Sequence, residues 1–135
     1  MKLFKYLGVV GSFMIITGGL WTCKDTITDG GYDDIVFPDS NVSYGRHVEP
    51  LFLRACAIPG CHDDNTQAGD LSLETYQAAR ARVGMIIPGD PDNSLLVRRI
   101  EGQLGGRMPP PPLPDLNVNQ IKGIRTWIRE GAQNN

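Results

Sequence analysis

One stretch near the middle of the chain holds two of its three cysteines and one of its two histidines. It reads Cys56-Ala57-Ile58-Pro59-Gly60-Cys61-His62. Four residues separate the two cysteines, and the histidine follows the second cysteine directly. Thiols and imidazoles bind metals, and thiols also form covalent links. The stretch therefore predicts a functional site built from Cys56, Cys61 and His62, around which the rest of the fold has to be arranged.

Two cysteines followed at once by a histidine indicate covalent attachment of c-type haem. The thiols add across the two vinyl groups, and the adjacent imidazole binds the iron from one side. The usual motif has two residues between the cysteines, whereas this one has four. Pro59-Gly60 favours a tight turn, so residues 58–60 can bulge outward while both sulfurs reach their vinyls. We expect one covalent haem c, held by Cys56 and Cys61 with His62 as an iron ligand.

The sequence alone leaves two other interpretations of the same residues possible. A Cys56–Cys61 disulfide is chemically open to an exported protein. A structural zinc site would require Cys56, Cys61, His62 and His47 to converge, although zinc motifs usually show paired spacing. His47 is also a candidate sixth iron ligand, but its place just before the motif favours a solvated helix position.

The N-terminus is predicted to be a targeting segment. Lys2 and Lys5 precede an apolar run from residue 7 to residue 20, which is short for a membrane span and typical of a signal peptide. The run ends at Leu20-Trp21-Thr22-Cys23, which resembles a bacterial lipobox and predicts lipidation of Cys23. We expect a signal peptide at 1–22, a flexible polar linker at 23–41 and a globular domain at 42–135.

Composition narrows the class of function. The formal net charge of the 135 residues is −2, and loss of Lys2 and Lys5 with the leader makes the mature chain more acidic. An acidic chain is not expected to bind nucleic acid, and a partner with a basic docking face suits it better. Aromatic residues make up only 7% of the chain, which predicts a thin core that a cofactor would help to stabilise.

Helical periodicity accounts for the expected domain, and no strand pattern competes with it. The first helix is expected at 44–55, with Pro50 kinking it or beginning a tighter second part. The second is expected at 73–82, and the third runs from a cap at Asp92 or Asn93 to about residue 101. The last helix begins after Asn117, which forms a capping box with Gln120, and stops at Gly131. The fold class is therefore all-α.

A second informative segment lies between the last two predicted helices. It reads Gly105-Gly106-Arg107-Met108-Pro109-Pro110-Pro111-Pro112. A Met thioether is a common second axial ligand in electron-transfer cytochromes, and prolines let a loop cross an apolar surface with few unpaired amides. Met108 is therefore the expected distal ligand, in preference to Met85. The alternative is a polyproline segment that binds a partner domain.

From about residue 44 to residue 132 the chain resembles a class I-type monohaem cytochrome c domain of the kind found in bacterial secreted and lipid-anchored proteins. The resemblance rests on the order and spacing of several pieces: Val48-Glu49-Pro50-Leu51-Phe52, Cys61-His62, Gly69-Asp70-Leu71-Ser72-Leu73, Pro88-Gly89-Asp90-Pro91-Asp92-Asn93-Ser94-Leu95-Leu96, Arg107-Met108-Pro109-Pro110 and Trp127-Ile128-Arg129-Glu130-Gly131-Ala132.

The resemblance implies about four helices wrapped around one haem. In it Cys56 and Cys61 are the thioether sites, and His62 and Met108 are the axial ligands. It also implies that the first and last helices cross, which places Val48 and Phe52 near Ile124 and Trp127. Further candidates are wall residues and arginines that can pair with haem propionates: Leu71, Leu73, Leu96, Ile100 and Trp127 for the wall, and Arg98, Arg99 and Arg107 for the propionates.

The function expected from these residues is one-electron transfer rather than catalysis, because two axial ligands leave the iron no open position. The protein is expected to be exported and lipid-anchored, on the periplasmic side or at the outer membrane. Its partners would be redox proteins, among them a membrane respiratory complex. The competing interpretation is a non-redox lipoprotein that carries a Cys56–Cys61 disulfide and binds partners through its proline loop.

Overall fold

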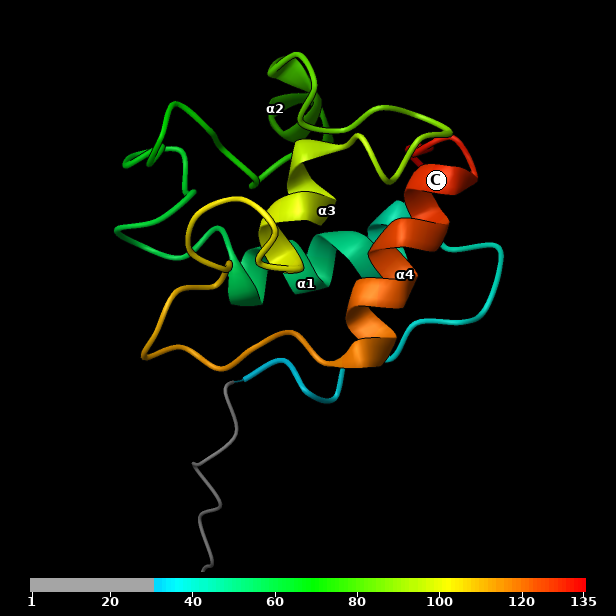
Figure 1. Ribbon diagram of the computed structural model, residues 1–135, viewed down its shortest axis with the longest axis horizontal. Helices are drawn as coiled ribbons and strands as arrows, with labels where there is room; N and C mark the ends of the chain where they lie inside the picture. The colour runs from blue at the N-terminus through cyan, green and yellow to red at the C-terminus, as the bar shows by residue number, and fades with distance from the viewer. Residues whose placement is uncertain (1–30) are drawn as a thin grey trace, which may run out of the picture.

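The structure, a computed structural model, describes residues 31–135, and within that range it contains α-helices and no strand. The all-α prediction is confirmed. A π-helical turn, η1 (Tyr44–Val48), leads into α1 (Glu49–Ala55), and three further helices follow: α2 (Tyr76–Ala81), α3 (Leu95–Ile100) and α4 (Val118–Arg129). Figure 1 shows long loops between these short helices, and most of them lie on one side of the molecule.

The first expected helix is divided at Pro50, as its sequence predicts. The amide of Val48 donates to the carbonyl of Ser43, five residues back, at 3.4 Å, which makes the wide turn of η1. Pro50 then lies in the first turn of α1, where the missing N–H costs no helical hydrogen bond. The helix ends at Ala55, so that it delivers Cys56 to the start of the following loop.

The two middle helices are shorter than their patterns predict. Helix α2 begins at Tyr76 because the side chain of Thr75 accepts from the amide of Ala78 at 3.1 Å and caps it. Helix α3 begins at Leu95, with Ser94 at the N-cap position in place of Asp92 or Asn93. The Ser94 hydroxyl instead donates to the carbonyl of Asp90 and accepts from the amide of Ile87.

Helix α4 closes the fold and matches its prediction closely. Asn117 and Gln120 form the expected capping box, with each side chain accepting from the amide of the other residue at 3.0 Å. The inward stripe of the helix is fully buried at Ile124, Trp127 and Ile128.

The core lies where α4 crosses α1 (Figure 1). The rings of Phe52 and Trp127 meet edge to face, with their centroids 6.4 Å apart. Tyr44 and Tyr76 complete an aromatic cluster with these two rings, at centroid separations of 5.2 to 6.5 Å. Such edge-to-face pairs stabilise a core beyond the area they bury. Most of the aromatic residues that the structure describes are therefore concentrated at one helix crossing.

The segment before η1 is part of the domain, which corrects the expected linker at 23–41. Tyr32, Ile35 and Phe37 are buried. The Tyr32 carbonyl accepts from the Gln120 side chain at 2.7 Å, and the backbone of Phe37 exchanges two hydrogen bonds with the side chain of Asn119. The folded unit therefore includes residues 32–41 and does not begin at residue 42.

The predicted signal peptide and Cys23 lie outside the described residues. Among residues 31–135, no helix is both long enough and apolar enough to span a membrane.

Candidate functional site

The extra residues between the two cysteines form a tight turn. The amide of Cys61 donates to the carbonyl of Ile58 at 3.0 Å, with Pro59 second and Gly60 third in the turn. Gly60 has φ +87°, which the third position of a type II turn requires. The amide of His62 then donates to the carbonyl of Cys56 at 3.1 Å. The predicted bulge at Pro59-Gly60 is therefore present, and it brings the second cysteine back beside the first.

His62 is held firmly by its backbone. Besides the bond from its amide to Cys56, its carbonyl accepts from the amide of Leu73 at 2.9 Å. Nδ1 of the His62 side chain is buried and has no hydrogen-bond partner among the described residues. Buried polar atoms are nearly always paired. An imidazole nitrogen in this condition is suited to bind a group that the polypeptide itself does not supply.

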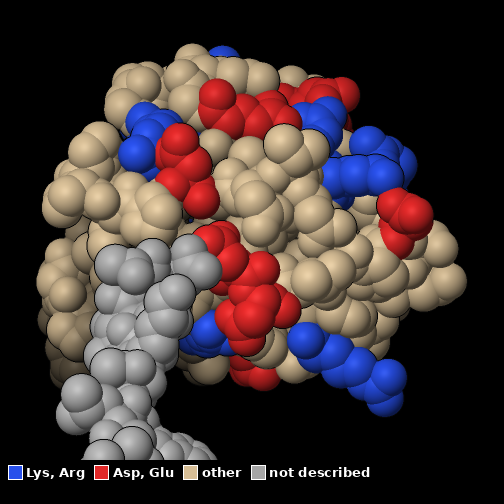
Figure 2. Space-filling model, turned by 90° about the horizontal axis from the view of Figure 1, so that it is seen from below, with Lys and Arg blue, Asp and Glu red and all other residues tan. Residues whose placement is uncertain are grey.

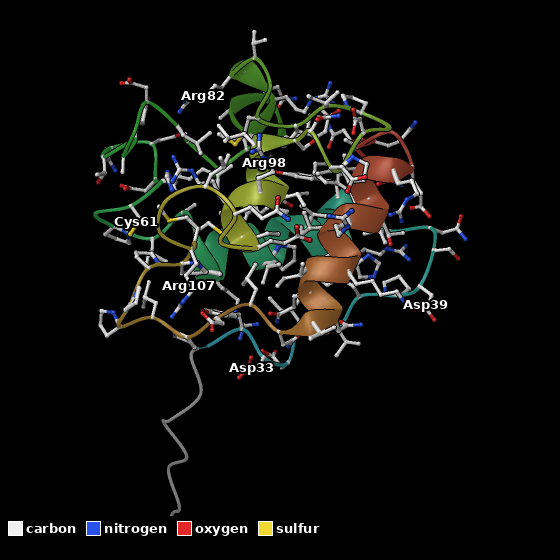
Figure 3. All side chains as sticks on the ribbon, viewed as in Figure 1. Asp33, Asp39, Cys61, Arg82, Arg98 and Arg107 are labelled. Carbon is white, nitrogen blue, oxygen red and sulfur yellow. The ribbon has the colours of Figure 1, made fainter. Side chains whose placement is uncertain are left out.

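Met108 comes to the same region from a different loop. The chain leaves α3 after Ile100 and turns back, and the amide of Met108 donates to the carbonyl of Arg99 at 3.0 Å. Arg107 stabilises the next part of the loop, because its guanidinium donates to the carbonyls of Pro109 and Leu113 and forms an ion pair with Asp115. Figure 3 shows Cys61 and Arg107 on the same side of the molecule, away from Asp39.

These loops enclose a cavity of about 360 Å³, within the size range of small-molecule and cofactor pockets. Cys56, Cys61, His62 and Met108 all line it. The expected wall residues Leu71, Leu73, Leu96 and Ile100 also line it. The four residues with reactive or ligating side chains therefore share one mostly apolar space, although 52 positions separate the first from the last.

Several expected residues lie elsewhere. Trp127 does not line the cavity, because its ring is fully buried in the aromatic cluster at the helix crossing. His47 is also outside it, since Nδ1 of its ring accepts from the amide of Ser43 at 3.0 Å and the ring lies against Phe37. Arg98 and Arg107 are not lining residues, whereas Arg99 is.

Sequence reasoning missed Arg82 and gave Met85 second place. Arg82 lines the cavity and donates to the carbonyl of Gly69 at 2.7 Å, so it links the end of α2 to the motif loop. Met85 is 4% exposed and lines the same space. No local pattern predicted the role of Arg82, because its place in the cavity depends on how α2 packs over a loop thirteen residues earlier.

The two cysteines are free thiols, and burial raises the pKa of Cys56 to about 12, with a further contribution from Cys61. A thiol with so high a pKa carries little thiolate, the form that attacks in disulfide exchange. No group of three or more His, Cys, Asp or Glu side chains within residues 31–135 is arranged to hold a metal ion, so the described structure does not form the zinc alternative.

The donor set fits a haem. An apolar cavity with two thiols, an imidazole whose buried nitrogen lacks a partner, and a thioether from a second loop offers what a covalently attached haem requires. The proline tract also belongs to this site, since Pro109 and Pro110 line the cavity and Pro109 is buried. Its first half is thus not available to a partner domain as a free polyproline segment.

The comparison with known families agrees with this geometry. Residues 59–112, somewhat less than half of the chain, match the family described as Planctomycete cytochrome C. That range includes Cys61, His62, both cavity methionines and most of the apolar wall. Searches of curated proteins and of solved structures gave no match. The helical fold and the family match together support a cytochrome c-like domain, and with it a haem-based role in electron transfer.

Proposed function

We propose that the protein is a one-electron carrier that holds a single covalent haem c, with thioether links at Cys56 and Cys61 and axial ligation by His62 and Met108. The observation that carries the proposal is that these four residues, from two separate loops, line one apolar cavity. When bound, the haem supplies a one-electron iron couple whose potential a Met ligand raises.

The residues of the chain then perform three tasks. The turn at Pro59-Gly60 presents both thiols to the cavity, and the two backbone hydrogen bonds of His62 fix where its imidazole lies. The buried leucines of the wall exclude water and lower the local polarity, which disfavours the more highly charged oxidation state. The loop that carries Met108 closes the second side of the cavity.

An electron carrier rather than an enzyme is favoured, since an imidazole and a thioether that line the same space would offer a bound iron two protein ligands. We further propose export, with a lipid on Cys23 as membrane anchor, on the periplasmic side or at the outer membrane. Redox proteins, including a membrane respiratory complex, are the proposed partners. The leader pattern and the acidic charge of the chain support this part of the proposal.

The test is to produce the full chain in a host with c-type maturation machinery and to measure its intact mass and visible spectrum. We expect the mass of one added haem, retained after denaturation, and a reduced α-band at about 550 nm. Cys56→Ser and Cys61→Ser should each move the band to longer wavelength, because one vinyl group stays conjugated with the ring. A colourless protein from such a host would rule the proposal out.

The distal ligand is tested with matched methionine variants. Met108→Ala should abolish the red charge-transfer absorption of a ferric iron–thioether bond and let carbon monoxide bind the reduced protein. Met85→Ala, which removes the other thioether of the cavity, should leave that absorption in place. The opposite result would identify Met85 as the ligand. An intact mass of the mature protein also reports lipid on Cys23.

A further inference from the structure

The loop that presents Met108 is rich in glycine and requires a support. Gly102, Gly105 and Gly106 lie in it, and the first two have positive φ. Glycines increase the conformational entropy that must be lost when a loop adopts one arrangement. Because Met108 lies at the end of this stretch, the position of its thioether depends on contacts that hold the loop to the rest of the domain.

Arg99 makes those contacts at both ends of the glycine stretch. Its Nη1 donates to the carbonyl of Leu104 at 2.7 Å, in the middle of the loop. Its backbone carbonyl accepts from the amides of Gly102 and Met108, at 3.2 and 3.0 Å. One residue in the last turn of α3 is therefore bonded to the beginning, the middle and the end of the loop.

The packing around Gly105 shows how closely the guanidinium approaches the loop. A Cβ added to Gly105 would lie 3.2 Å from Nη1 of Arg99, tighter than ordinary contact. Arg99 also lines the cavity and is half-buried. The ion pairs found within residues 31–135 involve other cations, namely Arg54, Arg107, Lys122 and Arg125. In the described structure, the bond to the loop is thus the hydrogen bond that fixes the Arg99 side chain.

We propose that Arg99 is the positioning residue for Met108: its guanidinium holds the loop of residues 101–108 against α3 and so fixes the thioether at the cavity. This inference rests on the proposed function only where it concerns iron ligation. The bracing of the loop itself is a property of the polypeptide and is measured separately.

The adjacent Arg98 provides a matched control. It lies on the same helix and has the same charge, but its side chain neither lines the cavity nor makes a hydrogen bond in the described structure; Figure 3 labels it on α3. Arg98→Gln and Arg99→Gln therefore change the charge of the molecule equally. Arg99→Gln removes the bond to Leu104 and also changes a side chain that lines the cavity, whereas Arg98→Gln does neither.

The first measurement is amide hydrogen exchange in the full chain. Arg99→Gln should speed exchange of the Met108 amide about tenfold, the effect expected from losing one charge-assisted hydrogen bond. Amides in α4 should be unaffected, which shows that the domain stays folded. Arg99→Lys should restore part of the protection, since an ammonium keeps a charged donor. Equal exchange in the Arg98→Gln and Arg99→Gln variants would overturn the proposal.

The second measurement is the visible spectrum of haem-loaded protein. In Arg99→Gln the red absorption of the ferric iron–thioether bond should fall, with unchanged haem content, while Arg98→Gln keeps it. If the unsubstituted protein carries no haem, the proposed function fails, but the exchange experiment still decides whether Arg99 braces the loop. If Arg99→Gln does not fold, the same pair of readouts on Arg99→Lys decides it. There, partial loss of Met108 amide protection and of the red absorption relative to a matched Arg98→Lys variant supports the brace, and values equal to those of Arg98→Lys would overturn it.

Discussion

Gly123 illustrates how much one residue can depend on a distant contact. It is buried in the middle of α4, where a glycine ordinarily weakens a helix. A Cβ at this position would overlap the ring of Phe37, which lies directly against the helix backbone. The glycine therefore serves the packing of the N-terminal segment on α4, and its cost in helix propensity is offset by that packing.

We predict that Gly123→Ala destabilises the domain by about 1–3 kcal/mol, as overpacking of a core does, although alanine is the better helix former by about 1 kcal/mol. The free energy of unfolding in urea measures it. In the double variant with Phe37→Gly the overlapping ring and Cβ of residue 37 are both absent, so the alanine at position 123 should recover its intrinsic advantage as a helix former. Additive effects of the two substitutions would contradict the contact.

At the scale of single residues, the turn at Pro59-Gly60 could be predicted from the sequence, whereas the need for glycine at position 123 could not. The turn is local, and its two residues carry the backbone preferences that define it. The need for glycine at position 123 arises from Phe37, 86 positions earlier in the chain. No pattern within α4 reports a partner at that distance, so the sequence shows only an unexplained helix breaker.

At the scale of elements, the segment before η1 behaves as a structural element without regular secondary structure. Three of its apolar side chains are buried, and α4 supplies hydrogen bonds to its backbone through Asn119 and Gln120. Its sequence is polar and contains paired glycines and aspartates, so composition alone indicates a linker. The contacts that order it are tertiary, which is why the predicted boundary falls at residue 42.

We predict that a chain beginning at Val42 is strongly destabilised relative to a chain beginning at Gly31. The shorter chain loses Tyr32, Ile35 and Phe37, and full burial of each such side chain is worth about 1.5–3 kcal/mol. Thermal unfolding of the two chains, both without haem, makes the comparison. Equal midpoints would show that residues 31–41 are dispensable.

The helices differ in how close together in the sequence the residues lie that determine where each helix begins and ends. The capping box of α4 and the division of the first helix at Pro50 follow from residues within a few positions of each other. The predicted start of α3 is wrong, because Asp92 and Asn93 are residue types that cap helices equally well. Ser94 takes the position, while its hydroxyl bonds to the preceding turn rather than to the helix.

At the scale of the whole molecule, charge is balanced by ion pairs rather than separated. On the face drawn in Figure 2, acidic side chains lie in several groups with basic side chains next to them. The Arg54 and Lys122 side chains hydrogen-bond to Asp34 and Asp39, and they lower the pKa of both carboxyls. All these groups are largely exposed, so each pair stabilises the fold only modestly and is screened by salt.

Since the pKa values of Asp34 and Asp39 are lower in the folded protein than the ordinary 3.8, their contribution is complete above that pH. It is lost as pH falls through the lowered values. We predict a urea midpoint that declines as the pH falls below about 4. The variant with both Asp34→Asn and Asp39→Asn should decline less steeply, and high salt should shrink the difference between the two. Parallel profiles would argue against the pairs.

The candidate site is a property of the whole molecule and was only partly foreseeable. The candidate attachment and ligand residues, Cys56, Cys61, His62 and Met108, could be identified from their types and order in the sequence, and all four line the cavity. The exclusion of Trp127, and the presence of Arg82, follow from which side of each helix faces the loops. The spacing of apolar residues along a helix shows which face of the helix points inward. It does not show whether that face packs against the core or lines the cavity.

The packing of residues 32–41 on α4 also limits how far the domain could lie from a lipid on Cys23. Only nine positions separate Cys23 from Tyr32. An extended chain spans at most about 3.6 Å per residue, so a lipid on Cys23 would keep the domain within about 30 Å of the bilayer. A free linker to residue 41 would have allowed about twice that reach. The domain would then stay within reach of partners in the same membrane, which it would meet by lateral diffusion in two dimensions.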